Sequence, residues 1–183
     1  MNIKTISIAL FIGVSVLISC TTGKNCQKEN KNTKSIINNL KTESKMKEEQ
    51  LEKNKEVALN LSKAIMAGKW QEVDNLLAGD FKYEADGRPA IGKQEYIGFM
   101  KGVLSVAFTD MDMDFLHVIA EGDLVAIDYI NKMTHSAEFY GIPATNKRVI
   151  ATGQFIREIK NGKVIAEWQT TNTAGLMQQL TAK

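Results

Sequence analysis

The sequence predicts an α+β domain in which helices come first and an antiparallel sheet follows. Apolar residues recur at helical spacing in the first half of the chain, and strand patterns separated by short turn signals dominate after Thr109. Residues 51–183 have the length of one domain. A run of helices followed by a run of strands favours helices packed on one face of a sheet.

The chain begins with a segment typical of a signal peptide. Lys4 precedes an apolar run from Ile6 to Ile18, which is too short to favour a membrane span. The run ends in Leu-Ile-Ser-Cys at Cys20, which resembles the bacterial lipobox. The resemblance implies removal of residues 1–19 and lipidation of Cys20 in a lipoprotein anchored to a membrane of the bacterial cell envelope. An ordinary signal peptide or an uncleaved anchor is the alternative.

Residues 20–50 are expected to form a flexible polar tether. They are rich in Lys, Asn, Glu, Ser and Thr, a composition that buries too little apolar surface to offset the entropy lost on ordering. Alternatively, the last part of this segment, from about Lys41, already belongs to the first helix. Cys26 has no disulfide partner if Cys20 carries lipid, so the stability of the domain must come from a packed core.

Composition argues against several classes of partner. Lys and Arg total 23 and Asp and Glu total 21, a net charge of +2. No basic stripe with interleaved aromatic residues indicates nucleic-acid binding. No Cys/His cluster has the spacing of zinc ligands. We therefore expect neither a nucleic-acid partner nor a metal.

Helices are predicted before the strands. The first is striped by Leu51, Ala58, Leu61 and Ile65 and ends at Gly68. A second short helix and a third helix follow, and a short helix closes the chain. Their apolar residues or bounds are Trp70 to Leu77, then Ile97, Met100 and Leu104, and finally Gly175 to Leu180 with Thr173 as its cap.

Strands are predicted where apolar residues alternate with polar ones. Asn161-Gly162 is a strong hairpin signal, and Glu121-Gly122-Asp123 is a second tight turn. The strands would form an antiparallel meander, with one longer loop before the third long strand. The expected segments are a short strand at 81–84 and four long strands at 111–120, 124–138, 147–160 and 163–172.

Residues 131–153 carry a family resemblance. Their matching pieces are Thr134-His135, Glu138-Phe139, Gly141-Ile142-Pro143, Thr145 and Lys147-Arg148-Val149. These pieces resemble the SnoaL-like polyketide cyclases, also called ester cyclases, of the NTF2-like group. Ala90 to Lys93 and Gly162 to Ile165 fit the same family in the same order. The resemblance covers residues 51–183 and implies an NTF2-like cone, with N-terminal helices packed on a curved antiparallel sheet that commonly pairs into a homodimer.

A pocket is expected on the concave side of this sheet. Side chains on a strand alternate between its faces, so Tyr129, Asn131, Met133 and His135 share one face. That face mixes apolar bulk with a few polar groups, as ligand pockets do. We predict Tyr129, Asn131, Met133, Trp168 and Asn172 as substrate-binding residues for a small apolar molecule.

The resemblance implies a reaction without metal or cofactor. In the family, an acidic residue removes a proton beside a carbonyl, and the substrate closes a ring by an aldol-type step. Positions after Trp168 that commonly carry this acid hold Gln169 and Asn172 here. His135, Glu138 and Asp128 are the predicted catalytic residues, and Glu167, directly before Trp168, is a further nearby carboxylate. Glu138 and Glu167 are otherwise solvated edge residues or salt-bridge partners, and Asp128 would pair with Lys132.

Two functions stay open at this level. One is a cofactor-free cyclase, isomerase or hydrolase acting on a small carbonyl compound. The other is a lipid-anchored module that binds a small ligand or a partner without chemistry. The motif from Thr134 to Val149 favours a retained family pocket, whereas the amides of Gln169 and Asn172 favour binding alone. The fold hosts both kinds of function and does not choose between them.

Overall fold

The computed structural model describes residues 23–182, with side chains from Asn32 onward. The chain divides into two compact units, residues 1–44 and residues 45–183. The predicted signal peptide and the lipidation site Cys20 lie outside the described residues, as does the side chain of Cys26. Within the described range, none of the helices combines the length and apolar character that a membrane crossing requires.

Helix α1 spans Gly23–Met66 and therefore includes most of the expected tether. Side chains from Asn32 to Gln50 are all exposed. Lys, Glu and Gln are good helix formers, and Lys45 pairs with Glu49 one turn away at 3.8 Å, so local interactions favour a helix where the composition alone suggested irregular chain. The flexibility of this segment stays a prediction.

The second unit begins its core on the last turns of α1. Ala58, Leu61 and Ala64 are buried, and the helix ends before Gly68, whose φ of +64° suits glycine. Helix α2 (Trp70–Leu76) follows. The expected third helix is α3 (Lys93–Phe99), which continues through a π-helical turn, η1 (Met100–Leu104), into α4 (Ser105–Ala107).

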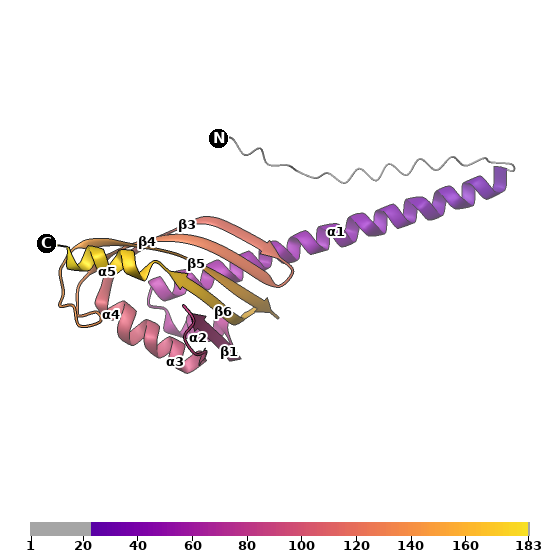
Figure 1. The fold of residues 1–183 in the computed structure, drawn as a ribbon. Coiled ribbons are helices and arrows are strands. Elements are labelled where there is room, and N and C mark those ends of the chain that lie inside the picture. Colours follow the sequence, from indigo (N-terminus) through magenta and orange to yellow (C-terminus); the bar gives the residue numbers. More distant parts are fainter. Residues whose placement is uncertain (1–22, 183) are drawn as a thin grey trace, which may run out of the picture. The chain divides into compact units, whose positions relative to one another are not determined.

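Six strands form one mixed sheet in the order β2-β1-β6-β5-β4-β3. Figure 1 shows β3 to β6 curving side by side. The strands are β1 (Leu77–Ala85), β2 (Ile91–Gly92), β3 (Phe108–Glu121), β4 (Leu124–His135), β5 (Arg148–Lys160) and β6 (Lys163–Thr171).

The four long strands form the predicted antiparallel meander, but the sheet is not wholly antiparallel. Strand β1 pairs in parallel with β6. The meander leaves one edge of β6 without a partner, and the N-terminal strand occupies that edge in the same direction as β6. This long-range pairing satisfies the free backbone groups of β6 and carries no local turn signal in the sequence.

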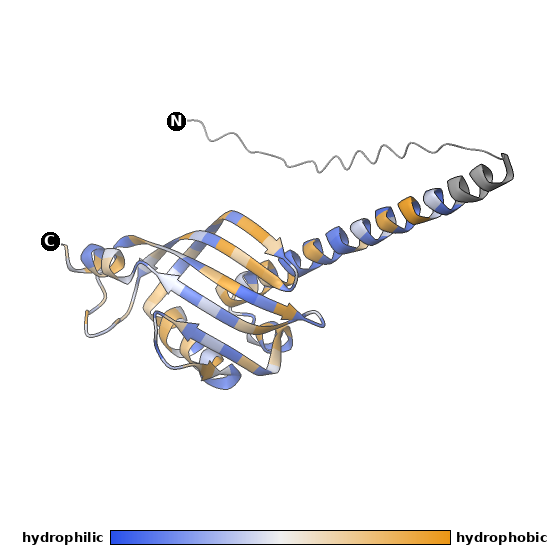
Figure 2. Ribbon diagram, turned by 45° about the vertical axis from the view of Figure 1, so that its right-hand side comes forward, coloured by the Kyte–Doolittle hydropathy of each residue, from blue (hydrophilic) through white to orange (hydrophobic). Residues whose placement is uncertain are grey.

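Hydrophobic and hydrophilic residues alternate along the strands in Figure 2, and burial alternates along β4 and much of β5. In β4 the predicted face is buried from Val125 through His135, and the residues between are exposed or half-buried. Helix α5 (Thr173–Thr181) follows β6 and covers the adjoining end of the sheet with the buried side chains of Leu176 and Leu180. Its cap is Asn172 rather than the predicted Thr173, because Asn172 Oδ1 accepts the Gly175 N–H at 2.9 Å.

Candidate functional site

A cavity of about 370 Å³ opens on the inner face of the sheet. A dry cavity of about 150 Å³ already accepts benzene, so this one has room for a ligand of one to two rings. Apolar side chains make most of the wall, among them Phe99, Met100, Phe108, Met111, Met113, Phe155 and Leu176.

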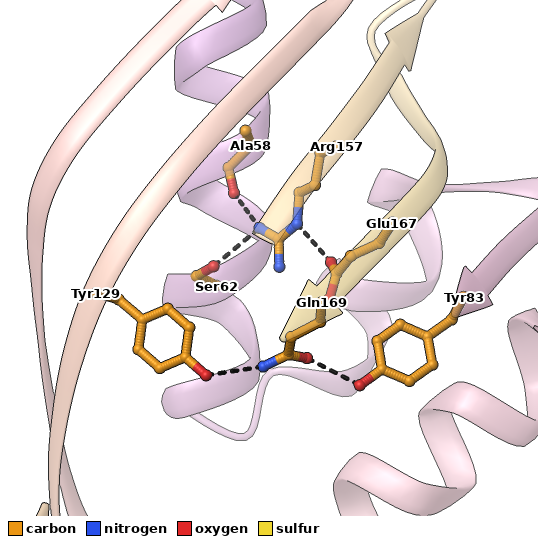
Figure 3. A network of polar contacts seen from close by, with 7 residues as sticks. All are labelled: Ala58, Ser62, Tyr83, Tyr129, Arg157, Glu167 and Gln169. Carbon is orange, nitrogen blue, oxygen red and sulfur yellow. Dashed lines mark hydrogen bonds and ion pairs between the residues drawn. The ribbon is translucent and has the colours of Figure 1, made fainter. Parts of the chain in front are cut away.

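One wall of the cavity holds a buried ion pair. Arg157 Nε lies 2.5 Å from Glu167 Oε2, and the two side chains are 3% and 2% exposed. The guanidinium also donates to Ser62 Oγ at 2.8 Å and to the Ala58 carbonyl of α1, as Figure 3 shows. Several bonds to one guanidinium offset the cost of burying the charges, so the pair ties α1 to the sheet.

Glu167 is the one buried carboxylate among the described residues that line the cavity. Asp86 and Glu95 also line it, but both are exposed near its mouth. Arg157 Nε donates to Oε2 of Glu167.

Beside the ion pair, two tyrosines are joined through an amide (Figure 3). Tyr83 donates to Gln169 Oε1 at 2.8 Å, and Gln169 Nε2 donates to the Tyr129 hydroxyl at 2.9 Å. The Tyr129 hydroxyl also lies 3.0 Å from Thr171 Oγ1. Burial raises the pKa of Tyr83, as does the charge of Glu167, and burial raises the pKa of Tyr129. Both phenols are therefore neutral at physiological pH.

Gly153 makes room for this arrangement. It stands opposite Tyr129 in the pairing of β4 with β5. A Cβ atom at Gly153 would lie 2.6 Å from the Tyr129 hydroxyl and 2.4 Å from the Thr170 carbonyl oxygen. Only glycine lets the Tyr129 ring cross β5 and reach Gln169 and Thr171 on β6.

Two polar atoms of the lining have no hydrogen-bond partner. They are the hydroxyl of Tyr96 and Oδ1 of Asn131, both buried atoms, in residues that are 0% and 9% exposed. Burial raises the pKa of Tyr96 well above its usual value, so this phenol is also neutral. Buried polar groups without partners are rare and costly in native proteins. Both atoms belong to residues that line the cavity, although neither atom is itself exposed to it.

The predicted site residues separate into two groups. Tyr129, Asn131 and Met133 line the cavity together. Asn172 caps α5, and Trp168 lies on the outer face of the sheet with 39% of its surface exposed. Since side chains alternate along β6 and Glu167 and Gln169 point inward, Trp168 must point outward.

The three predicted catalytic residues lie away from the cavity wall. His135 is fully buried beside Phe108, at 5.4 Å between ring centroids, but it does not line the cavity. Its Nδ1 accepts the Thr145 N–H at 3.2 Å, which places the imidazole proton on Nε2. His135 therefore fixes the loop that follows β4.

Glu138 and Asp128 face solvent rather than the cavity. Glu138 is exposed. Asp128 Oδ2 lies 3.1 Å from Nδ1 of His117, and the expected partner Lys132 instead binds Asp114 at 2.8 Å. The prediction of an Asp128–Lys132 pair was wrong because these residues lie four positions apart on one strand, whereas β3 places His117 directly across from Asp128 and Asp114 diagonally across from Lys132.

Sequence reasoning missed Tyr83, Tyr96 and Arg157. A signal for Arg157 exists, because alternation puts it on the buried face of β5 with Phe155 and Ile159. Tyr83 and Tyr96 reach the cavity through the β1–β6 pairing and the packing of α3, which have no local signature. No group of three or more His, Cys, Asp or Glu side chains in residues 32–182 is placed to hold a metal ion.

Comparison with known proteins places these features in a family. The family model of the SnoaL-like polyketide cyclases matches residues 55–180. No protein of curated function matches the sequence.

Solved structures share the fold. AclR, a proposed hydroxylase from Streptomyces galilaeus, is 22% identical, with 71% of this chain and 82% of AclR covered and a TM-score of 0.66. IdmH, a proposed polyketide cyclase from Streptomyces antibioticus, is 21% identical over 69% of this chain and 97% of its own, with a TM-score of 0.63. A proposed polyketide cyclase from Acidithiobacillus ferrooxidans is 26% identical over 70% and 94%, with a TM-score of 0.62. The similarity confirms the predicted NTF2-like α+β architecture, with a mixed rather than antiparallel sheet.

Proposed function

Because this chain belongs to the SnoaL-like polyketide cyclase family, we propose that its cavity binds a small, largely apolar carbonyl compound and catalyses a cofactor-free proton transfer of the cyclase or isomerase type. One observation carries the proposal. A buried carboxylate, Glu167, shares the lining of an apolar cavity with Tyr96 and Asn131, each of which has an unpartnered polar atom. Such a cavity suits a ligand that is mostly apolar and has a few polar atoms.

Glu167 is the proposed base. Its carboxylate takes a proton from the carbon next to the ligand carbonyl, and the bonding electrons move into an enolate whose charge lies on oxygen. The enolate carbon then attacks a second carbonyl of the same molecule to close a ring, and the alkoxide formed there takes the proton back from Glu167. In an isomerisation, the enolate instead regains that proton at another carbon. Protein donors placed at the enolate oxygen would stabilise the developing charge.

This proposal assigns the base to Glu167, which the sequence favoured as a solvated or salt-bridged residue, rather than to the three predicted catalytic residues. His135, Glu138 and Asp128 lie outside the lining of the cavity, and the nearby positions 169 and 172 hold amides. Glu167 is the described carboxylate that is both buried and part of the lining.

A binding module without chemistry is the second candidate. It is favoured by the Arg157–Glu167 ion pair, because a carboxylate that binds this guanidinium stabilises the junction of α1 and the sheet. In that case the cavity would bind the same class of ligand and release it unchanged.

Hydrogen–deuterium exchange separates these two candidates. The carbon-bound protons next to the carbonyl of 1-indanone should exchange in D₂O faster with the protein than in buffer, as followed by proton NMR. Glu167→Gln should abolish the acceleration, and Glu138→Gln, which changes an exposed carboxylate, should retain it.

Glu167→Gln leaves Arg157 without its anion and destabilises the fold. The double variant Arg157→Leu with Glu167→Leu removes both charges, so it should fold, bind 1-indanone and fail to accelerate exchange. Full acceleration in this double variant would reject Glu167 as the base. Binding by the wild type without accelerated exchange would favour the binding module.

We also propose that Cys20 carries the lipid that anchors the protein to a membrane of the bacterial envelope. The lipobox-like sequence at residues 17–20 supports this proposal. Cys20→Ser should lose incorporation of labelled palmitate and move the protein to the soluble fraction. Equal membrane retention of the variant and the wild type would contradict it.

A further inference from the structure

We propose that the Tyr129 hydroxyl donates the hydrogen bond that holds the carbonyl oxygen of the ligand, and that Gln169 and Tyr83 are positioning residues that set the direction of this bond. The inference rests on the proposed function and adds the group that contacts the oxygen. Tyr129, Gln169 and Tyr83 all line the cavity. The hydrogen bonds among these three residues, shown in Figure 3, set the direction of the bond from Tyr83 to Gln169 and from Gln169 to Tyr129.

The direction of the hydrogen bonds follows from the chemistry of the amide. Gln169 Oε1 can only accept, so Tyr83 donates to it. Gln169 Nε2 can only donate, and it reaches the hydroxyl oxygen of Tyr129 at 2.9 Å. The Tyr129 oxygen is thereby an acceptor toward Gln169, and its own proton is directed elsewhere.

Without a ligand, Thr171 can receive that proton. The two hydroxyls lie 3.0 Å apart, and either one can be the donor. When a carbonyl oxygen approaches, Tyr129 can turn its proton from Thr171 to the ligand, while its oxygen keeps the hydrogen bond from Gln169. Thr171 Oγ1 also lies 3.3 Å from Gln169 Nε2 and keeps that donor. The exchange replaces one hydrogen bond of Tyr129 by another, so the donor is available at little cost.

Two further observations fit a donor. The absence of a side chain at Gly153 gives the Tyr129 ring its path across β5, because a Cβ there would lie 2.6 Å from the Tyr129 hydroxyl as well as 2.4 Å from the Thr170 carbonyl oxygen. Burial also raises the pKa of Tyr129, which keeps the phenol protonated. A neutral buried phenol with a directed proton suits an oxygen that becomes negative when Glu167 removes a proton from the neighbouring carbon.

The test compares 1-indanone with indane, which has the same rings without the carbonyl. Dissociation constants come from NMR titration of the methionine methyl groups of the cavity. Tyr129→Phe should raise the dissociation constant of 1-indanone roughly three- to tenfold, the range expected for one neutral hydrogen bond. The dissociation constant of indane should stay unchanged. The infrared carbonyl stretch of bound ¹³C-labelled 1-indanone should shift to lower frequency in the wild type and lose that shift in Tyr129→Phe.

Gln169→Glu tests the positioning residues. A carboxylate of the same shape accepts from both tyrosines, so it takes the Tyr129 proton and should weaken 1-indanone at least as much as Tyr129→Phe. Tyr83→Phe should show a smaller loss. Trp168→Phe changes the outward neighbour of Gln169 and should have no effect.

The outcomes distinguish this inference from the proposed function. If Tyr129→Phe weakens the binding of 1-indanone and of indane equally, or changes the binding of neither compound, Tyr129 is not the donor, even though the cavity binds both compounds. If Gln169→Glu strengthens 1-indanone binding, the assigned direction is wrong. If the wild type binds neither compound, the proposed function fails first and this inference fails with it.

Discussion

The two faces of β4 show how differently one strand can use its polar residues. On the inner face, Tyr129 and Asn131 are buried, and Tyr129 contacts residues of β6 that are distant in the sequence. On the outer face, Asp128 and Lys132 pair with side chains of the adjacent β3 and stay partly exposed. Water screens the outer pairs, so they contribute little, whereas each inner contact is expensive to leave unmade.

The largest effect is therefore expected at the buried ion pair. Arg157→Ala leaves Glu167 charged and unpaired and should lower the free energy of unfolding by about 3–5 kcal/mol. Lys132→Ala, which breaks the exposed pair with Asp114, should have a much smaller effect. Urea denaturation of both variants measures the difference. If both variants lose a comparable free energy of unfolding, the buried and the exposed ion pair contribute equally to stability, and this prediction is wrong.

A smaller effect is expected at Gly153. Gly153→Ala pushes a methyl group into the Thr170 carbonyl and the Tyr129 hydroxyl and should cost about 1–3 kcal/mol of stability. Gly98→Ala is the matched control, because a Cβ at exposed Gly98 in α3 meets nothing within 4 Å. That change should stabilise the helix by up to about 1 kcal/mol. Thermal unfolding of the two variants should thus give shifts of opposite sign.

High pH provides a third comparison, through the buried phenols. The pKa of Tyr83 is raised in the folded state by burial and by the charge of Glu167, so the unfolded chain loses this proton first as pH rises. The stability from Tyr83 is fully present below its unfolded pKa of about 10 and is lost as pH rises above it. Tyr83→Phe should flatten the fall in stability between roughly pH 9.5 and 11. Trp168→Phe, which removes no ionisable group, should keep the wild-type slope.

The outer face should be the least sensitive in stability and the most sensitive in assembly. Ile119, Ile156 and Trp168 are exposed there, and the strand pairing aligns them across the sheet through Ala126. We predict a homodimer through this face for protein beginning near Lys41. Ile119→Glu should change the free energy of unfolding of one subunit by less than about 1 kcal/mol. Light scattering at roughly 10 µM protein or more should show that this variant is a monomer. A monomeric wild type under these conditions would reject the dimer.

The sequence by itself determined which residues of β4 are buried, where the long strands turn, and the family. These features are local. A period of two assigns alternate residues to opposite faces, and Asn161-Gly162 specifies its hairpin through backbone angles that these residues adopt readily, with φ of +52° and +72°. The predicted ligand residues Tyr129, Asn131 and Met133 followed from that period and do line one cavity.

Tertiary structure alone decided how the polar residues of the cavity are connected. Glu167 meets Arg157 because β6 lies beside β5, and Gln169 meets Tyr83, 86 positions away, because β6 also pairs with the N-terminal β1. The same arrangement turns Trp168 outward and leaves His135 behind Phe108. Long-range pairing is selected by the burial of the whole sheet, and the free energy of that burial belongs to no single stretch of sequence.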